Sequence, residues 1–104
     1  MSSQLRKGAL ELCVLSLLLY EDLYGYELIK IISETFPVSE GTIYPILRRL
    51  TKNNYLKTYT AASDQGPSRK YYKVTEEGAF YHHTLKSEWL DLSEKVNSII
   101  KEGK

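Results

Sequence analysis

The chain has 104 residues, of which 42% are hydrophobic and 26% are charged, and its formal net charge is +1. This length suits one small domain with a modest core, and the composition is that of a globular protein rather than a disordered chain. A lone cysteine, Cys13, excludes an internal disulfide framework, and the longest apolar run is far too short to span a membrane, so we expect a cytoplasmic protein with no membrane partner.

Positive charge is unevenly distributed along the chain. Residues 1–10 carry +2, residues 40–56 carry +2 and residues 57–74 carry +3, whereas residues 11–39 carry −4 and residues 75–104 carry −2. A local cationic patch, rather than the net value, attracts phosphates. The distribution is compatible with nucleic-acid binding, although an ordinary mixed surface would satisfy it equally well.

The N-terminal third of the chain predicts two helices. Residues 4–20 are apolar over more than half of the helix circumference, and their two stripes are Leu10, Val14, Leu17, Leu18 and Leu5, Ala9, Leu12, Ser16, Leu19. A globular helix needs only one stripe, so we expect the second to meet another element or another subunit. Gly25 is predicted to open a second helix, and residues 35–38, which include Pro37, to form the turn after it.

Residues 39–50 predict a short amphipathic helix. Ser39 suits the N-cap position, whereas Pro45 lacks a donor inside the helix and crowds the carbonyl of Gly41. Ile43, Ile46, Leu47 and Leu50 recur at helical spacing and should face the core. The remaining side chains are candidates for contacts with DNA bases or phosphates: Ser39, Glu40, Thr42, Tyr44, Arg48 and Arg49. Tyr44 could instead be an edge of the core, and the two arginines could be solvated charges.

A basic hairpin should follow. Residues 56–61 and 69–74 predict two strands, and the composition of residues 62–68 predicts a turn between them. Arg69 and Lys70 are candidate phosphate contacts. Tyr71 and Tyr72 alternate along a strand, so one of them must face the core; we assign Tyr71 to the DNA backbone. Lys7, near the N-terminus, is a candidate contact to a flanking phosphate.

The last helix has a spacing of its own. Thr75 is the expected N-cap, and Leu85, Trp89, Leu92, Val96 and Ile99 follow at intervals of 4, 3, 4 and 3 residues, which is typical of a coiled-coil seam. The simplest cover for this seam is a second copy of the chain, although the helix could fold back on its own domain. The predicted dimer interface comprises Leu5, Leu12, Leu19, Leu92, Val96 and Ile99.

Catalytic and metal-binding patterns are absent from the sequence. There is no glycine-rich phosphate loop, no Cys/His cluster at ligand spacing and no nucleophile with an evident base. His82 and His83 are adjacent, so on a helix they point about 100° apart and cannot both face one metal. We expect no enzyme activity, no metal site and no cofactor.

Three blocks also carry a family resemblance. Tyr-Gly-Tyr-Glu-Leu at residues 24–28, Gly-Thr-Ile-Tyr-Pro-Ile-Leu-Arg-Arg-Leu at residues 41–50 and Arg-Lys-Tyr-Tyr-Lys-Val-Thr-Glu-Glu-Gly at residues 69–78 resemble the signature blocks of PadR-like transcriptional regulators. The single C-terminal helix resembles that of the small subfamily. This resemblance implies a winged-helix dimer that represses transcription, in which Trp89 meets its counterpart across the dimer and stacks on flat aromatic ligands.

The sequence therefore predicts an α+β, mostly helical fold: a winged helix-turn-helix domain at residues 1–75 and a C-terminal dimerisation helix at residues 76–104. We expect a homodimeric repressor that binds an inverted repeat in double-stranded DNA and responds to a small planar aromatic effector. Candidate effector contacts are Trp89, Leu85, Glu11 and Ser93, unless Trp89 only packs the interface. The alternative is a winged-helix adaptor that binds proteins and not DNA.

Overall fold

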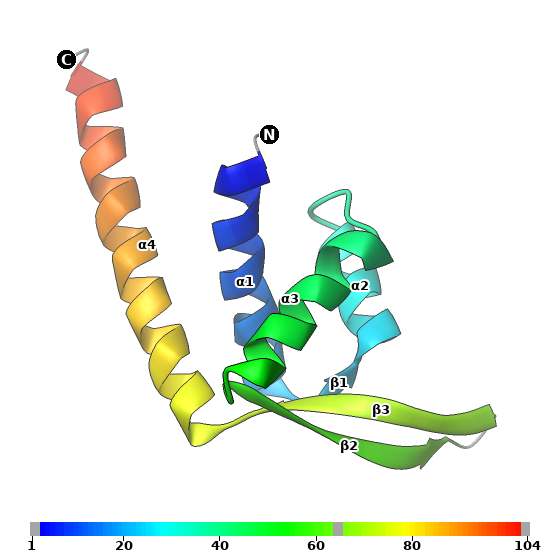
Figure 1. Cartoon of the computed structure of the whole chain (residues 1–104). Helices are drawn as coiled ribbons and strands as arrows, with labels where there is room; N and C mark the ends of the chain where they lie inside the picture. The colour runs from blue at the N-terminus through cyan, green and yellow to red at the C-terminus, as the bar shows by residue number, and fades with distance from the viewer. Residues whose placement is uncertain (1–2, 64–65, 103–104) are drawn as a thin grey trace.

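The computed structural model describes residues 3–63 and 66–102, with the side chains of residues 3–7 outside that description. The elements in chain order are α1 (Ser3–Tyr20), β1 (Leu23–Tyr24), α2 (Gly25–Ser33), α3 (Glu40–Lys52), β2 (Leu56–Ser63), β3 (Gly66–Val74) and α4 (Glu76–Glu102). The three strands form one antiparallel sheet in the order β1-β3-β2. Helices α1, α2 and α3 gather on one side, the β2–β3 hairpin extends away from them, and α4 stands beside α1 (Figure 1).

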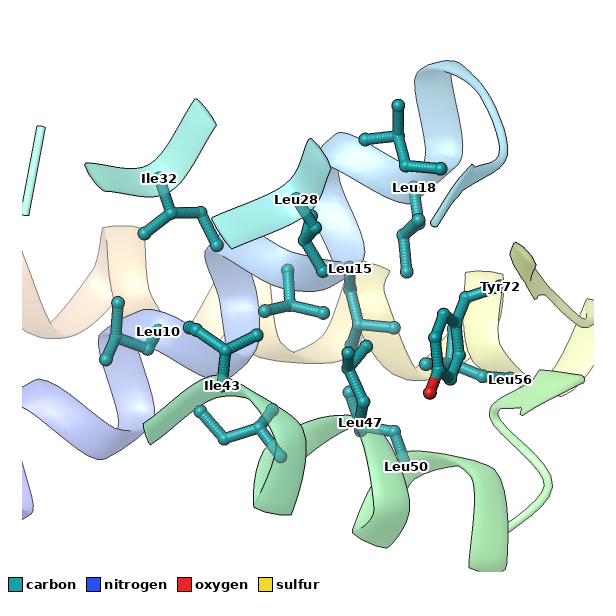
Figure 2. Close-up of a cluster of buried hydrophobic side chains, with 13 residues drawn as sticks. Leu10, Leu15, Leu18, Leu28, Ile32, Ile43, Leu47, Leu50, Leu56 and Tyr72 are labelled. Atoms are coloured by element: carbon teal, nitrogen blue, oxygen red, sulfur yellow. The ribbon is translucent and has the colours of Figure 1, made fainter. Parts of the chain in front are cut away.

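The core lies between the first three helices and the root of the sheet. Its thirteen buried hydrophobic side chains come from α1, α2, α3 and the three strands, and none of the described ones comes from α4 (Figure 2). The four apolar positions of α3 are all buried, as their spacing predicts: Ile43, Ile46, Leu47 and Leu50. The core therefore fixes the orientation of α3 and turns its other side outward.

Local hydrogen bonds end α3 and turn the chain into the hairpin. Asn54 has a positive φ of 66°, which asparagine tolerates better than most residues. The amide of Tyr55 donates to the carbonyl of Leu50 at 2.9 Å, and that of Asn54 donates to Thr51 at 3.0 Å. These two bonds form a Schellman-type end, so β2 leaves α3 in a fixed direction.

The start of α4 is tied to the same corner. The hydroxyl of Thr75 accepts the amide of Gly78 at 2.9 Å and donates to the carbonyl of Asn54 at 2.7 Å, which confirms Thr75 as the N-cap. A Cβ atom at Gly78 would lie 2.0 Å from the carbonyl oxygen of Tyr55. Because glycine permits this close approach, α4 can leave the hairpin directly against the end of α3.

Two features differ from the sequence-based expectation. The short strand β1 was not predicted, and the hairpin strands are longer than expected, because β2 continues through Ser63 and β3 begins at Gly66. Residues 64–65 of the predicted turn lie outside the described part. Ser39 does occupy the N-cap position of α3, but its side chain makes no capping hydrogen bond. Its carbonyl instead accepts the amides of Thr42 and Ile43, each at 3.1 Å.

Candidate nucleic-acid interface

A cleft of about 390 Å³ opens between α3, the hairpin and the amino end of α2. The described residues that line it combine aromatic, cationic and glycine positions, and none of these is acidic: Tyr24, Gly25, Tyr26, Tyr44, Arg48, Arg69, Lys70 and Tyr72. Four of the predicted DNA-contacting residues therefore share one site, namely Tyr44, Arg48, Arg69 and Lys70.

Helix α3 presents Tyr44 and Arg48 to the cleft from adjacent turns, since residues four apart lie on one face. Tyr44 lies very close to the start of α2. A Cβ atom at Gly25 would sit 2.6 Å from the Tyr44 hydroxyl oxygen, so glycine is needed for this approach. Arg48 is exposed and makes no ion pair within the described part of the chain.

The hairpin supplies the other wall. The ammonium of Lys70 lies 5.8 Å from the ring centroid of Tyr72, and the guanidinium carbon of Arg69 lies 4.5 Å from that of Tyr24. Tyr72 is 6% exposed, which confirms that one of the paired tyrosines faces the core. Burial raises the pKa of Tyr72, with a further contribution from Tyr44, while the Arg48 charge acts in the opposite direction.

Tyr71 is not brought into this cleft. Its ring stacks on that of Tyr59 with centroids 5.5 Å apart and meets the edge of Tyr24 at 5.7 Å. The Tyr59 hydroxyl donates to Asp22 at 2.6 Å, and this bond is the main reason that the pKa of Tyr59 rises to about 12. Tyr71 thus belongs to an aromatic cluster on the side of the sheet opposite Tyr72.

Arg49 is placed differently from its neighbour Arg48. Its guanidinium donates to the carboxylate of Glu11 at 2.7 Å, and the other oxygen of that carboxylate accepts the hydroxyl of Tyr81 at 2.5 Å. Burial, and then the bond to Glu11, raises the pKa of Tyr81 to about 12. This contact joins α3 to α1 and α4, so the structure gives Arg49 and Glu11 a bridging position.

The remaining predicted DNA contacts lie outside the cleft. Ser39 and Glu40 are exposed at the amino end of α3, and Thr42 is partly exposed beside them. Lys7 lies in α1, but its side chain is outside the described part. The amino end of α3 is therefore an exposed surface separate from the cationic cleft.

A second groove, of about 330 Å³, runs between α1 and α4. Its lining includes the predicted effector residues Trp89 and Leu85 and the predicted interface residues Leu12 and Leu92. Leu85 also packs against the core, and neither Glu11 nor Ser93 lines the groove. Trp89 is 39% exposed, so a large part of its ring faces open space.

Beyond this groove the apolar seam of α4 is uncovered. Leu92, Val96 and Ile99 are 55%, 45% and 57% exposed, and Leu19 of α1 is also exposed. The side chain of Leu5 is outside the described part. Isolated exposed apolar residues are ordinary, but a continuous row along one helix marks an interaction surface.

The described residues hold no cluster of three or more histidine, cysteine or acidic side chains that could bind a metal ion. His82 instead faces Ser16, with its Nε2 atom 2.8 Å from the serine hydroxyl oxygen. No helix in residues 3–63 and 66–102 is both long enough and apolar enough to cross a membrane.

Sequence reasoning missed half of the cleft. Tyr24, Gly25, Tyr26 and Tyr72 line it, yet none of them was predicted to belong to a DNA-binding site. The two-residue strand β1, which brings Tyr24 opposite Tyr71, is too short for a periodic signal. The available signal was a glycine flanked by two tyrosines at a helix start, which indicates a close approach of another group to the backbone.

Three helices with a three-stranded antiparallel sheet, followed by a long terminal helix, define a winged helix-turn-helix protein with an added C-terminal helix. Residues 14–83 match the family model described as the transcriptional regulator PadR-like family. The chain belongs to the PadR-like family of transcriptional regulators.

Similar solved structures agree with this assignment. A Streptococcus transcriptional regulator is 40% identical, with a TM-score of 0.87 over 94% of this chain and 98% of its own. A PadR-like transcriptional regulator from Bacillus cereus is also 40% identical, with a TM-score of 0.84 over 94% and 97% of the two chains. An uncharacterised protein from Lysinibacillus sphaericus is 33% identical over 99 residues, which is 91% of each chain.

Proposed function

We propose that this protein is a cytoplasmic, homodimeric transcriptional repressor that binds an inverted-repeat operator. The observation that carries the proposal is the cleft in which Arg48, Arg69 and Lys70 gather beside the exposed side of α3. Residues 1–75 act as the DNA-binding domain and residues 76–104 as the dimerisation helix, without any enzymatic step.

Each α3 enters a major groove of the operator. Ser39, Glu40 and Thr42, at its amino end, approach base edges and select the sequence. Arg48, with the hairpin cations, contacts phosphates and sets the position of the protein on the duplex. Gathering of these cations on one surface also favours DNA binding over the adaptor alternative, since an adaptor has no need for such a surface.

The dimer forms through the exposed seam of α4, with Leu12 and Leu19 of α1 against the partner. Leu92, Val96 and Ile99 supply the apolar surface that a monomer would leave in water. A two-fold dimer presents the same two α3 helices to the two halves of a palindromic site. The operator is therefore an inverted repeat.

In vitro selection from a random duplex library tests DNA binding directly. The selected sequences should contain an inverted repeat, and the logarithm of the binding constant should fall linearly with the logarithm of salt concentration. Replacing Lys70 with Gln should weaken binding to all duplexes alike and reduce that slope by roughly 0.9. Failure to enrich any sequence, or binding that does not respond to salt, would favour the adaptor.

The groove between α1 and α4 is the site proposed for an effector. Trp89 offers an indole face for stacking and for attraction to a cation, and Leu12, Leu85 and Leu92 supply an apolar lining. A flat aromatic ligand held there would change the spacing of the two α3 helices and weaken operator binding.

The single tryptophan of the chain makes this proposal measurable. Titration with planar cationic dyes should quench the emission of Trp89 and weaken binding to the selected duplex over the same concentration range. The Trp89→Ala variant, tested as a dimer that still binds DNA, should bind the duplex without responding to the dyes. If no dye of the panel changes the emission of Trp89 and the variant still binds DNA, then Trp89 only packs the interface and binds no effector.

A further inference from the structure

The cleft contains a buried phenol that has no hydrogen-bond partner among the described residues. Tyr72 is 6% exposed, and its hydroxyl makes no hydrogen bond to any residue in the described ranges 3–63 and 66–102. Most buried polar groups in proteins are paired, because leaving one unpaired costs about 1–3 kcal/mol. Tyr72 lines the cleft, so an occupant of that space can supply the missing partner.

The surroundings of Tyr72 favour an anion. Arg48 and Lys70 both line the cleft and make no ion pair within the described part of the chain, while Arg69 lies at its edge over Tyr24. None of the described residues that line the space carries a carboxylate. Helix α2 also starts at Gly25 in the same wall, but its own Glu27 already places a carboxylate in the first turn and accepts the amide of Tyr24 at 3.4 Å. The positive charge of the cleft therefore comes from its side chains.

We propose that the cleft binds one phosphate of the DNA backbone in each protomer, with the Tyr72 hydroxyl as a hydrogen-bond donor to a phosphate oxygen. Arg48 and Lys70 supply the opposing charge. This inference rests on the proposed function, because it is the DNA duplex that delivers the phosphate.

The location of the cleft favours a phosphate of the DNA backbone over a small free anion as its ligand. The cleft opens between α3 and the hairpin. In the proposed complex α3 enters the major groove and the hairpin lies along the adjacent DNA backbone. A phosphate held there is gripped from the helix and from the hairpin at once. The contact therefore fixes the angle of α3 in the groove without reading sequence.

The Tyr72→Phe variant isolates this contact, because it removes one oxygen and preserves the buried ring. With the duplex selected from the random library as the probe, we expect its affinity to fall about ten-fold or more, the typical effect of losing a hydrogen bond to a charged group. Non-specific duplexes should lose affinity by the same factor. The salt slope should stay unchanged because the phenol is neutral, whereas Arg48→Gln should reduce it by roughly 0.9.

Tyr59→Phe is the matched control. It also removes a phenolic oxygen from the hairpin, but that oxygen bonds to Asp22 and lies outside the cleft. Affinity of this variant should equal that of the wild type. Both Phe variants should retain the far-UV circular dichroism spectrum and the dimer mass of the wild type. A difference in affinity between them would then not be caused by misfolding.

Single methylphosphonate substitutions along the selected duplex locate the phosphate. One position in each half-site should weaken binding of the wild type. The same substitution should weaken Tyr72→Phe by a smaller factor, because the variant has already lost the phenol's bond to that phosphate and keeps only the attraction of Arg48 and Lys70. If Tyr72→Phe binds the duplex with wild-type affinity and responds to each methylphosphonate as the wild type does, then the cleft does not hold the phosphate through Tyr72. DNA binding itself would stand.

Two further outcomes would also overturn the inference. Displacement of DNA by millimolar inorganic phosphate at constant ionic strength, in the wild type but not in Tyr72→Phe, would identify a small-anion site instead. If the library yields no bound duplex, the proposed DNA-binding function is refuted, and the inference of a bound DNA phosphate is refuted as well.

Discussion

The adjacent arginines of α3 should have separable roles. The guanidinium of Arg49 is held by Glu11 at 2.7 Å, whereas Arg48 is exposed at the cleft. Replacing each in turn with Gln removes one charge and keeps a polar side chain of similar reach. We expect Arg49→Gln to lower the free energy of unfolding, and Arg48→Gln to lower DNA affinity.

The burial of the Arg49–Glu11 pair sets the size of the stability loss. The Glu11 side chain is 14% exposed and that of Arg49 is 36% exposed. Exposed ion pairs contribute about 0.2–1 kcal/mol, and breaking a fully buried pair costs about 3–5 kcal/mol. An intermediate pair, in which Glu11 keeps the hydrogen bond from Tyr81, should contribute about 1–2 kcal/mol. The melting temperature of Arg49→Gln should therefore fall by roughly 5–15 °C.

Arg48→Gln should change stability by less than about 0.5 kcal/mol, since its side chain is exposed and unpaired within the described residues. Its salt slope for DNA binding should fall by roughly 0.9 for one lost phosphate contact. Thermal melts at equal protomer concentration and salt titrations with a selected duplex measure both quantities. A reduced salt slope in Arg49→Gln with an unchanged melting temperature would show that Arg49 leaves Glu11 for DNA, which would refute the assignment.

Three further predictions concern the dimer, the bridge between helices and the cleft. Val96→Glu would bury a charge twice in the dimer, so sedimentation should show monomers that no longer bind the operator; a dimeric variant would exclude this seam. The folded-state pKa of Tyr81, about 12, exceeds its ordinary value of 10.0, so its contribution to stability is complete below pH 10 and is lost as pH rises from 10 toward 12. Urea unfolding should show the wild type losing stability relative to Tyr81→Phe in that window, whereas a constant difference would contradict the raised pKa. Gly25→Ala should push the Tyr44 ring out of the cleft and lower DNA affinity about ten-fold with little loss of fold, and unchanged affinity would show that Tyr44 makes no contact.

The sequence was sufficient to predict α3 because its information is local. Apolar residues at helical spacing, a serine before them and a following basic hairpin fix the helix, its buried side and its neighbours. Pro45 did not prevent the helix, which spans Glu40–Lys52. The buried side of α3 is confirmed at each of its four predicted positions.

Contacts between distant segments could not be predicted in the same way. Arg48 and Arg49 are equivalent by composition, and only the position of Glu11, 38 residues earlier in the chain, separates them. The extent of the hairpin strands is set by pairing between β2 and β3, so the turn-like composition of residues 62–68 was misleading. Strand β1 is defined by its pairing with β3. A segment of two residues is too short to show a strand pattern in the sequence.

Most of α4 lies outside the core. Its side chains contribute only partly buried contacts at Tyr81 and Leu85, near its start, and the following turns leave their apolar side exposed. A helix of 27 residues is about 40 Å long, so most of it extends past the part that touches the core. The first turns of α4 are tied to α3 through Thr75 and through the bridge at Glu11. A partner bound to the exposed turns would therefore set the orientation of α3 through a short chain of direct contacts, which is what a two-fold DNA-binding protein requires.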